Sequence, residues 1–157
     1  MEITLLSVGK ISSQWIQEGI NLFKSRIQNY IKFSTVIIPD IKNTRFLSIE
    51  NQKEEEGKLI MEQINSSDFV VLMDEKGKEY TSREFADWMQ KQMNSGKKRI
   101  LIIIGGPYGF SKGLYQRANS LIALSKMTFT HEMAKLVLTE QIYRGLTILR
   151  GEPYHHD

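Results

Sequence analysis

Short aliphatic runs alternate with longer amphipathic stretches along this chain, and the alternation predicts strands separated by helices. After the first run, apolar residues recur at three- and four-residue steps, which is typical of a helix with one buried face. Thr81 and Glu84 form a capping-box pattern, and Ser111 stands where a helix N-cap is expected. The predicted strands are residues 3–8, 33–38, 69–73, 100–104 and 121–124, and the predicted helices cover 15–31, 50–64, 81–93, 111–119 and 131–149.

Strands that alternate with helices imply an α/β fold, with a mostly parallel sheet flanked by helices on both faces. The 157 residues, of which 41% are hydrophobic, suffice for one well-packed domain over residues 1–157. No repeat or linker divides the chain. The glutamates at 54–56 are interpreted as a solvated helix face, and residues 74–78 as a turn.

The last predicted helix carries apolar residues all round its circumference. Such a helix is buried on all sides, and a domain of this size covers only one of them with its sheet. An identical subunit is the simplest source of the second apolar surface, so the pattern predicts a homodimer. The apolar residues are Met133, Leu136, Val137, Leu138, Ile142, Tyr143, Leu146, Ile148 and Leu149.

Composition excludes some classes of site and leaves others open. The chain has no cysteine, which excludes disulfides, zinc–cysteine sites and thiol catalysis. No basic leader or long apolar stretch is present, so we expect a cytoplasmic protein without a membrane span. Residues 97–157 hold nine basic and four acidic residues, which suits a phosphate-bearing partner such as RNA. A solvated basic face remains the commoner explanation.

A glycine-rich turn follows the most apolar predicted strand. Residues 100–104 read ILIII, which indicates a strand buried on both faces, and Gly105, Gly106 and Gly109 come next. Glycines allow close backbone approach, and ligands of open α/β sheets bind beyond the carboxyl ends of strands. The turn is therefore a candidate ligand site, although a plain strand-to-helix connection is an equal alternative.

Two further stretches follow the carboxyl ends of predicted strands, at 73–77 and 124–129. Together with 105–109 they could enclose one pocket, with main-chain groups reading an adenine edge and apolar side chains holding its ring. From spacing alone, core packing of 124–129 is the favoured alternative.

Three segments carry a family resemblance. They are ITLLSVGK at 3–10, IGGPYG at 104–109 and LSKMTFTHEMAKLVLTEQIYRGLTILRGEPYHH at 124–156. With these segments and its overall length, the chain closely resembles the RlmH family of ribosomal RNA large subunit methyltransferases, in the SPOUT superfamily. The most specific part is LSKMTFTHEM and TEQIYR followed by a terminal PYHH.

The resemblance implies a SPOUT-type α/β fold with a C-terminal trefoil knot, a homodimer, and S-adenosylmethionine as cofactor without a metal. The implied reaction methylates N3 of pseudouridine 1915 in helix 69 of 23S rRNA, on the assembled ribosome. The implied cofactor-binding residues are Met73, Gly105, Leu124, Ser125, Lys126, Met127, Thr128 and Phe129. The chain departs from the usual pattern at Met73, Thr130 and Lys135, where leucine, proline and arginine are common. If residue 135 contacts RNA, lysine makes the weaker contact, because it lacks the bidentate geometry of arginine.

Methyl transfer to an imide nitrogen needs alignment and removal of a proton. Arg144 is the first candidate to stabilise the developing charge, with Glu140 one helical turn before it to orient the guanidinium. An ordinary i,i+4 salt bridge is the alternative for this pair. With the family resemblance, Tyr154 is expected to contact the target base and His155 to shuttle its proton, in the cofactor pocket of the same or the other subunit.

Other functions are weaker interpretations of the same residues. His131-Glu132 lacks the second histidine of a zinc protease motif, and nothing supplies metal-ligand spacing. The glycine turn is not GxGxxG, which disfavours a nicotinamide-dependent oxidoreductase. A non-catalytic RNA-binding or ribosome-associated protein with the same fold remains the alternative. Candidate docking residues for RNA are Lys10, Lys112, Arg117 and Lys126.

Overall fold

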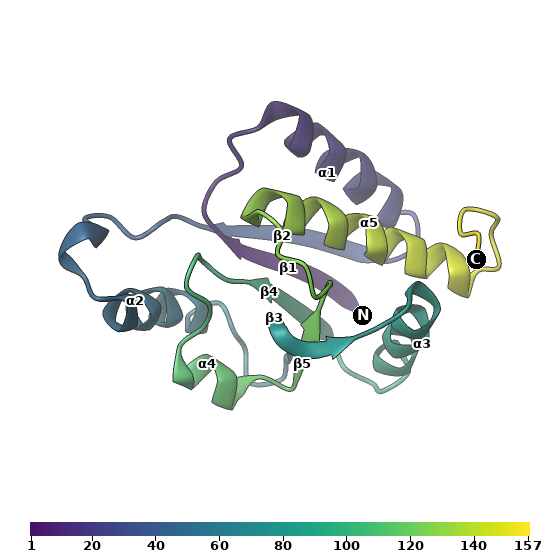
Figure 1. The fold of residues 1–157 in the computed structure, drawn as a ribbon. Coiled ribbons are helices and arrows are strands. Elements are labelled where there is room, and N and C mark those ends of the chain that lie inside the picture. The colour runs from purple at the N-terminus through teal and green to yellow at the C-terminus, as the bar shows by residue number, and fades with distance from the viewer.

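The computed structural model describes residues 1–157, and its centre is a five-stranded sheet in the order β2-β1-β4-β3-β5 (Figure 1). Every neighbouring pair of strands is parallel, which confirms the predicted α/β class. The most apolar strand, β4, lies between β1 and β3, and its buried residues pack on both faces. The strands are β1 (Glu2–Val8), β2 (Lys32–Ile38), β3 (Phe69–Glu79), β4 (Arg99–Ile104) and β5 (Ser120–Ala123).

The helices divide between the two faces of the sheet. Alternate residues of β4 belong to two separate cores: Ile100, Ile102 and Ile104 pack with α1, α3 and α5, whereas Leu101 and Ile103 pack with α2 and α4. This alternation follows from the two-residue period of a strand. The helices are α1 (Gln14–Ile27), α2 (Ile49–Met61), α3 (Ser82–Met93), α4 (Lys112–Arg117) and α5 (His131–Leu149), with a 3₁₀ turn η1 (Thr44–Phe46).

Strand β3 is longer than predicted. After Met73 the register shifts, and pairing with β5 resumes at Lys78 opposite Ile122. The predicted turn at 74–78 is therefore an irregularity within a strand. Gly77 permits it, because a Cβ atom there would lie 2.5 Å from the main-chain nitrogen of Ile122. The irregularity places Asp74 and the residues after it at the carboxyl ends of the strands, where the candidate site lies.

The environment of α5 corrects one inference from its apolar residues. No residue of α5 is exposed, and the helix packs between α1 and α3 over the sheet (Figure 1). A Cβ atom at Gly19 of α1 would lie 2.9 Å from Leu136, and one at Gly145 would lie 2.2 Å from the Met89 side chain of α3. Neighbouring helices of the same chain thus supply much of the apolar surface for which the sequence pattern predicts a second subunit. The homodimer stays a prediction.

Two smaller expectations are wrong. The apolar repeat over 15–31 predicts that its first residue, Trp15, lies on the buried face of α1, but the Trp15 side chain is 62% exposed. The glutamate run was expected to be solvated throughout, yet Glu56 is only 5% exposed whereas Glu54 and Glu55 are exposed. The predicted capping box of Thr81 and Glu84 and the N-cap at Ser111 are confirmed. No helix has the length and apolar character needed to cross a membrane.

Candidate functional site

Three adjoining cavities lie at the carboxyl edge of β3, β4 and β5, and Met73 lines all of them. A cavity of about 510 Å³ lies over the glycine turn and includes Gly105. One of about 180 Å³ lies beneath residues 124–129. A third, of about 240 Å³, lies between the end of β5 and the start of α3. The structure therefore brings together every residue predicted to bind the cofactor.

Parallel register explains this convergence. Met73 pairs with Ile104 of β4 and with Ile122 of β5, so the segments that leave these strands start at the same level. Leu124 lines two of the cavities. Ile104 and Phe129 line both the cavity over the glycine turn and the cavity beneath residues 124–129. Side chains of this kind suit a flat, largely apolar ligand.

The segment after β5 is held by local hydrogen bonds. The Ser125 hydroxyl accepts from the Met127 amide at 3.0 Å, and the Thr130 hydroxyl caps α5 by accepting from the Met133 amide at 3.3 Å. Thr130, where proline is common, therefore contributes a helix cap. Met127 is 79% exposed and Phe129 37% exposed, so apolar surface remains uncovered beside the cavities.

Asp74, in the stretch 73–77 predicted to enclose the pocket, has a partner that the sequence did not indicate, Tyr115. Both line the cavity over the glycine turn, and the Tyr115 hydroxyl donates to the Asp74 carboxylate. Burial, together with that carboxylate, raises the pKa of Tyr115 to about 12. Asp74 also accepts from the Lys76 amide at 2.8 Å. The position of 73–77 after a predicted strand was the signal for Asp74, whereas no local pattern indicated Tyr115 on α4.

A second group of polar side chains gathers around Glu140 near the end of α5. One carboxylate oxygen of Glu140 accepts from Arg144 at 2.5 Å and from the Tyr154 hydroxyl at 2.9 Å. Gln141 donates to the other oxygen at 2.8 Å. The Arg144 guanidinium also lies 4.8 Å from the centre of the Tyr154 ring, a cation–π distance. Arg144 and Glu140 thus form more than an isolated helix salt bridge.

The C-terminal tail is folded back onto this group. His155 lies 3.2 Å from Arg144 through one ring nitrogen and 3.0 Å from Asp157 through the other. Arg83 of α3 donates to both oxygens of Asp157, at 2.8 and 2.9 Å, and this holds the pKa of Asp157 down at about 2. Burial and the Glu140 contact raise the pKa of Tyr154. Arg83, which the sequence did not single out, anchors the tail.

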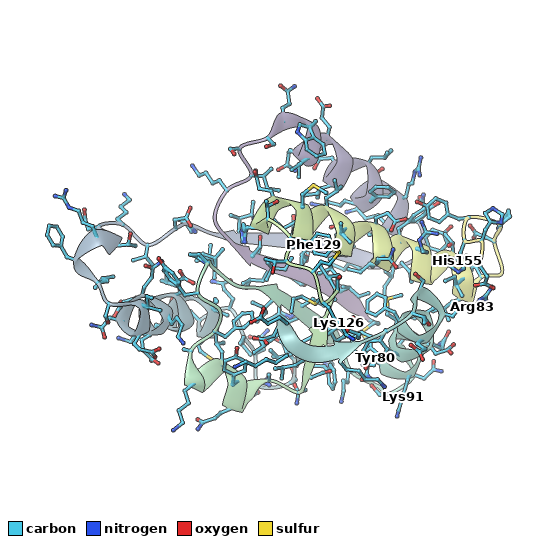
Figure 2. All side chains as sticks on the ribbon, viewed as in Figure 1. Tyr80, Arg83, Lys91, Lys126, Phe129 and His155 are labelled. Carbon is cyan, nitrogen blue, oxygen red and sulfur yellow. The ribbon has the colours of Figure 1, made fainter.

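The two groups of predicted site residues lie apart within one chain. None of Glu140, Arg144, Tyr154 or His155 lines the three cavities. Figure 2 shows Phe129 over the middle of the molecule and His155 at the far end of α5, a helix in which His131 and Arg144 are separated by roughly 20 Å. The nearest link is Gln141, which lines the third cavity and accepts from Ser82 at 2.8 Å.

The basic residues proposed for RNA docking differ in their surroundings. Lys10, Lys112 and Lys126 are exposed. Arg117 donates to the main-chain carbonyls of residues 65 and 68 at 3.0 and 3.1 Å, so its guanidinium already has partners within the chain. Lys135 is 2% exposed and donates to the Gly9 carbonyl at 2.8 Å. In this structure the ammonium group of Lys135 is buried and not available to contact RNA.

No group of three or more acidic or histidine side chains is arranged to hold a metal ion.

The sheet is parallel, and the cavities at the carboxyl ends of its strands are lined by a glycine turn and apolar side chains. This arrangement is typical of an α/β domain that binds a small molecule. Residues 1–155 match the family model described as predicted SPOUT methyltransferase. The chain belongs to the SPOUT methyltransferase family, as its sequence resemblance implied.

Curated relatives match the full length of the chain. Ribosomal RNA large subunit methyltransferase H of Christiangramia forsetii is 51% identical over 156 residues, covering 99% of each chain. The protein of the same description from Bacteroides thetaiotaomicron is 50% identical over 157 residues, covering 100% of each. Among solved structures, the SpoU methyltransferase AviRb from Streptomyces viridochromogenes, in complex with AdoMet, aligns with a TM-score of 0.45 and 9% identity, covering 96% of this chain and 61% of that one.

Proposed function

We propose that this protein is a cytoplasmic, S-adenosylmethionine-dependent methyltransferase that modifies N3 of pseudouridine 1915 in helix 69 of 23S rRNA on the assembled ribosome. The observation that carries the proposal is the convergence of Met73, Gly105 and Leu124–Phe129 on adjoining cavities. Full-length relatives described as ribosomal RNA large subunit methyltransferase H support the substrate class. The particular nucleotide comes from the family resemblance.

The cavity residues fit the cofactor. Main-chain groups of the glycine turn can pair with the edge of an adenine, and Met73, Leu124 and Phe129 offer apolar walls for its ring. Asp74 and Glu75 line two of the cavities, and their carboxylates offset the lysines in the same lining, so a ligand with a positively charged centre can be accommodated. When bound, S-adenosylmethionine supplies an activated methyl group on a sulfonium.

The Glu140 group fits the needs of the acceptor base. The imide of pseudouridine carries negative charge as its N3 proton leaves, and the Arg144 guanidinium can stabilise that charge at the imide oxygens. Glu140 fixes the orientation of Arg144. The Tyr154 hydroxyl, which donates to Glu140, can act as a hydrogen-bond donor in the site. His155, beside Arg144, is the candidate to carry the proton away.

A homodimer accounts for the separation of the two groups, with the Glu140 group of one chain completing the cavities of its partner. Exposed apolar side chains beside the cavities support a second protein surface there; they are Tyr108, Met127 and Phe129. The trefoil knot that the family resemblance implies is part of the same proposal.

Mixing two inactive variants tests the shared site. Arg144→Ala removes the cation, and Ser125→Trp fills the cavity beneath residues 124–129. Random reassembly is expected to restore about a quarter of the wild-type activity, because half of the dimers then contain one site with both intact parts. Activity is measured after the mixture has been dissociated and reassembled. A mixture as inactive as its components would contradict a site shared between chains.

Transfer of a labelled methyl group tests the function itself. We expect label in 23S rRNA when the ribosomes carry pseudouridine at the target position and none when they carry uridine there. Specific ribosome binding without transfer would instead support the non-catalytic RNA-binding alternative. In a separate measurement of ribosome affinity, replacing Lys10, Lys112 and Lys126 is expected to reduce its dependence on salt concentration.

A further inference from the structure

One acidic side chain behind the glycine turn has no part in the chemistry described so far. Glu56 of α2 is 5% exposed, whereas Glu54 and Glu55 beside it are exposed. None of the ion pairs in the structure includes Glu56. Burying a carboxylate without a cation is costly unless its oxygens contact other polar groups. The cost of burying Glu56 therefore depends on its polar partner.

The partner is Gly106. A Cβ atom at Gly106 would lie 2.4 Å from Oε1 and 2.6 Å from Oε2 of Glu56, so the carboxylate occupies the space that a side chain at 106 would need. The main-chain amide of Gly106 lies close enough to this carboxylate to lower its pKa. The remaining polar contact of Glu56 is the Gln52 amide at 3.4 Å. The carboxylate thus lies against the main chain of the turn.

The next residue of α2 fixes the other end of the same loop. A Cβ atom at Gly57 would lie 2.5 Å from the Ser111 hydroxyl, and Ser111 is the N-cap of α4. Lys53, one turn earlier on α2, lines the cavity over the glycine turn. Adjacent residues of one helix therefore contact both ends of the loop 106–111, and residues 106–110 of this loop line the cavity.

We propose that Glu56 is a positioning residue that holds the Gly105–Gly106 turn in the shape that receives the cofactor. A carboxylate suits this role because its oxygens only accept, and a charged acceptor binds a main-chain amide more strongly than a neutral one. Burial and the nearby Asp40 carboxylate raise the pKa of Glu56, and the Gln52 and Gly106 amides offset only part of that rise. The inference rests on the proposed function, since it concerns the same cavity.

The test compares cofactor binding with folding stability. Glu56→Ala is expected to weaken S-adenosylmethionine binding about tenfold, and the nearly isosteric Glu56→Gln about threefold. In steady state the change should appear in KM for the cofactor, with kcat within about twofold of wild type. Glu54→Gln, on the exposed side of α2, is the matched control and should change neither constant. If Glu56→Ala does not fold, Glu56→Gln supplies the result.

Unchanged cofactor affinity in both Glu56 variants, with a lower unfolding midpoint, would show a purely structural role and overturn the inference. Wild-type protein that does not bind S-adenosylmethionine would instead overturn the proposed function, so the two failures are distinguishable.

A double variant tests the contact from the other side. Gly106→Ala alone is expected to weaken cofactor binding, because its methyl group collides with the Glu56 carboxylate. In the Glu56→Ala background the methyl group has room, so the two effects should be less than additive. Fully additive effects would mean that Glu56 and Gly106 act independently, which contradicts the proposal.

Discussion

Replacement of Arg144 by alanine is expected to slow methyl transfer by about 10²- to 10³-fold, the usual loss when a group that stabilises developing charge is removed. Cofactor affinity should stay near the wild-type value, because Arg144 lines none of the cofactor cavities. Arg144→Lys keeps the charge but loses the planar fork that contacts Glu140 and His155, so an intermediate rate is expected.

Single-turnover methyl transfer to ribosomes measures this effect, with calorimetry to check cofactor binding. Arg150→Ala is a matched control, because Arg150 follows the same helix and its guanidinium lies 5.1 Å from the ring centre of Tyr30. Equal losses for the two arginine variants would show that Arg144 has no special part in the reaction.

Deletion of residues 154–157 is expected to abolish methyl transfer and leave cofactor binding largely intact. The deletion removes the hydroxyl that contacts Glu140 and the imidazole beside Arg144. It also removes Asp157, the residue through which Arg83 anchors the tail. Because these contacts lie at the far end of α5, the cofactor cavities should keep their shape.

Point variants separate the parts of the tail. Tyr154→Phe keeps the ring beside Arg144 but removes the hydroxyl, and His155→Gln removes the proton carrier. Each is expected to slow transfer without changing cofactor affinity. Equal loss of transfer and cofactor binding in the deletion variant would indicate a folding role for the tail.

The sequence predicted the strands and helices well, since each follows from hydrophobic period and capping residues. The order of the strands could not be predicted in this way, because periodicity does not indicate which strands are neighbours. The position of β4 between β1 and β3 was therefore learned from the structure. The same holds for the renewed pairing of β3 after Met73, which depends on the close approach of Gly77 to β5.

For the candidate site too, the sequence predicted local features and missed contacts between distant residues. Local motifs and the family resemblance indicated the segments at 73, 105 and 124–129, and all of them line the cavities. Contacts between distant parts of the chain were missed, among them Arg83 with Asp157 and Tyr115 with Asp74. The burial of Glu56 could have been predicted, because Glu56 lies four residues before the buried Ile60 on α2 and therefore on the same helix face.

Calorimetric titration with S-adenosylmethionine is the most direct measurement of the central claim, that the cavities at the carboxyl edge of β3, β4 and β5 hold this cofactor. The account predicts saturable binding at one site per chain, loss of that binding in Ser125→Trp, and no binding of NADH. Absence of binding by freshly dialysed wild-type protein, or unchanged binding by Ser125→Trp, would contradict it.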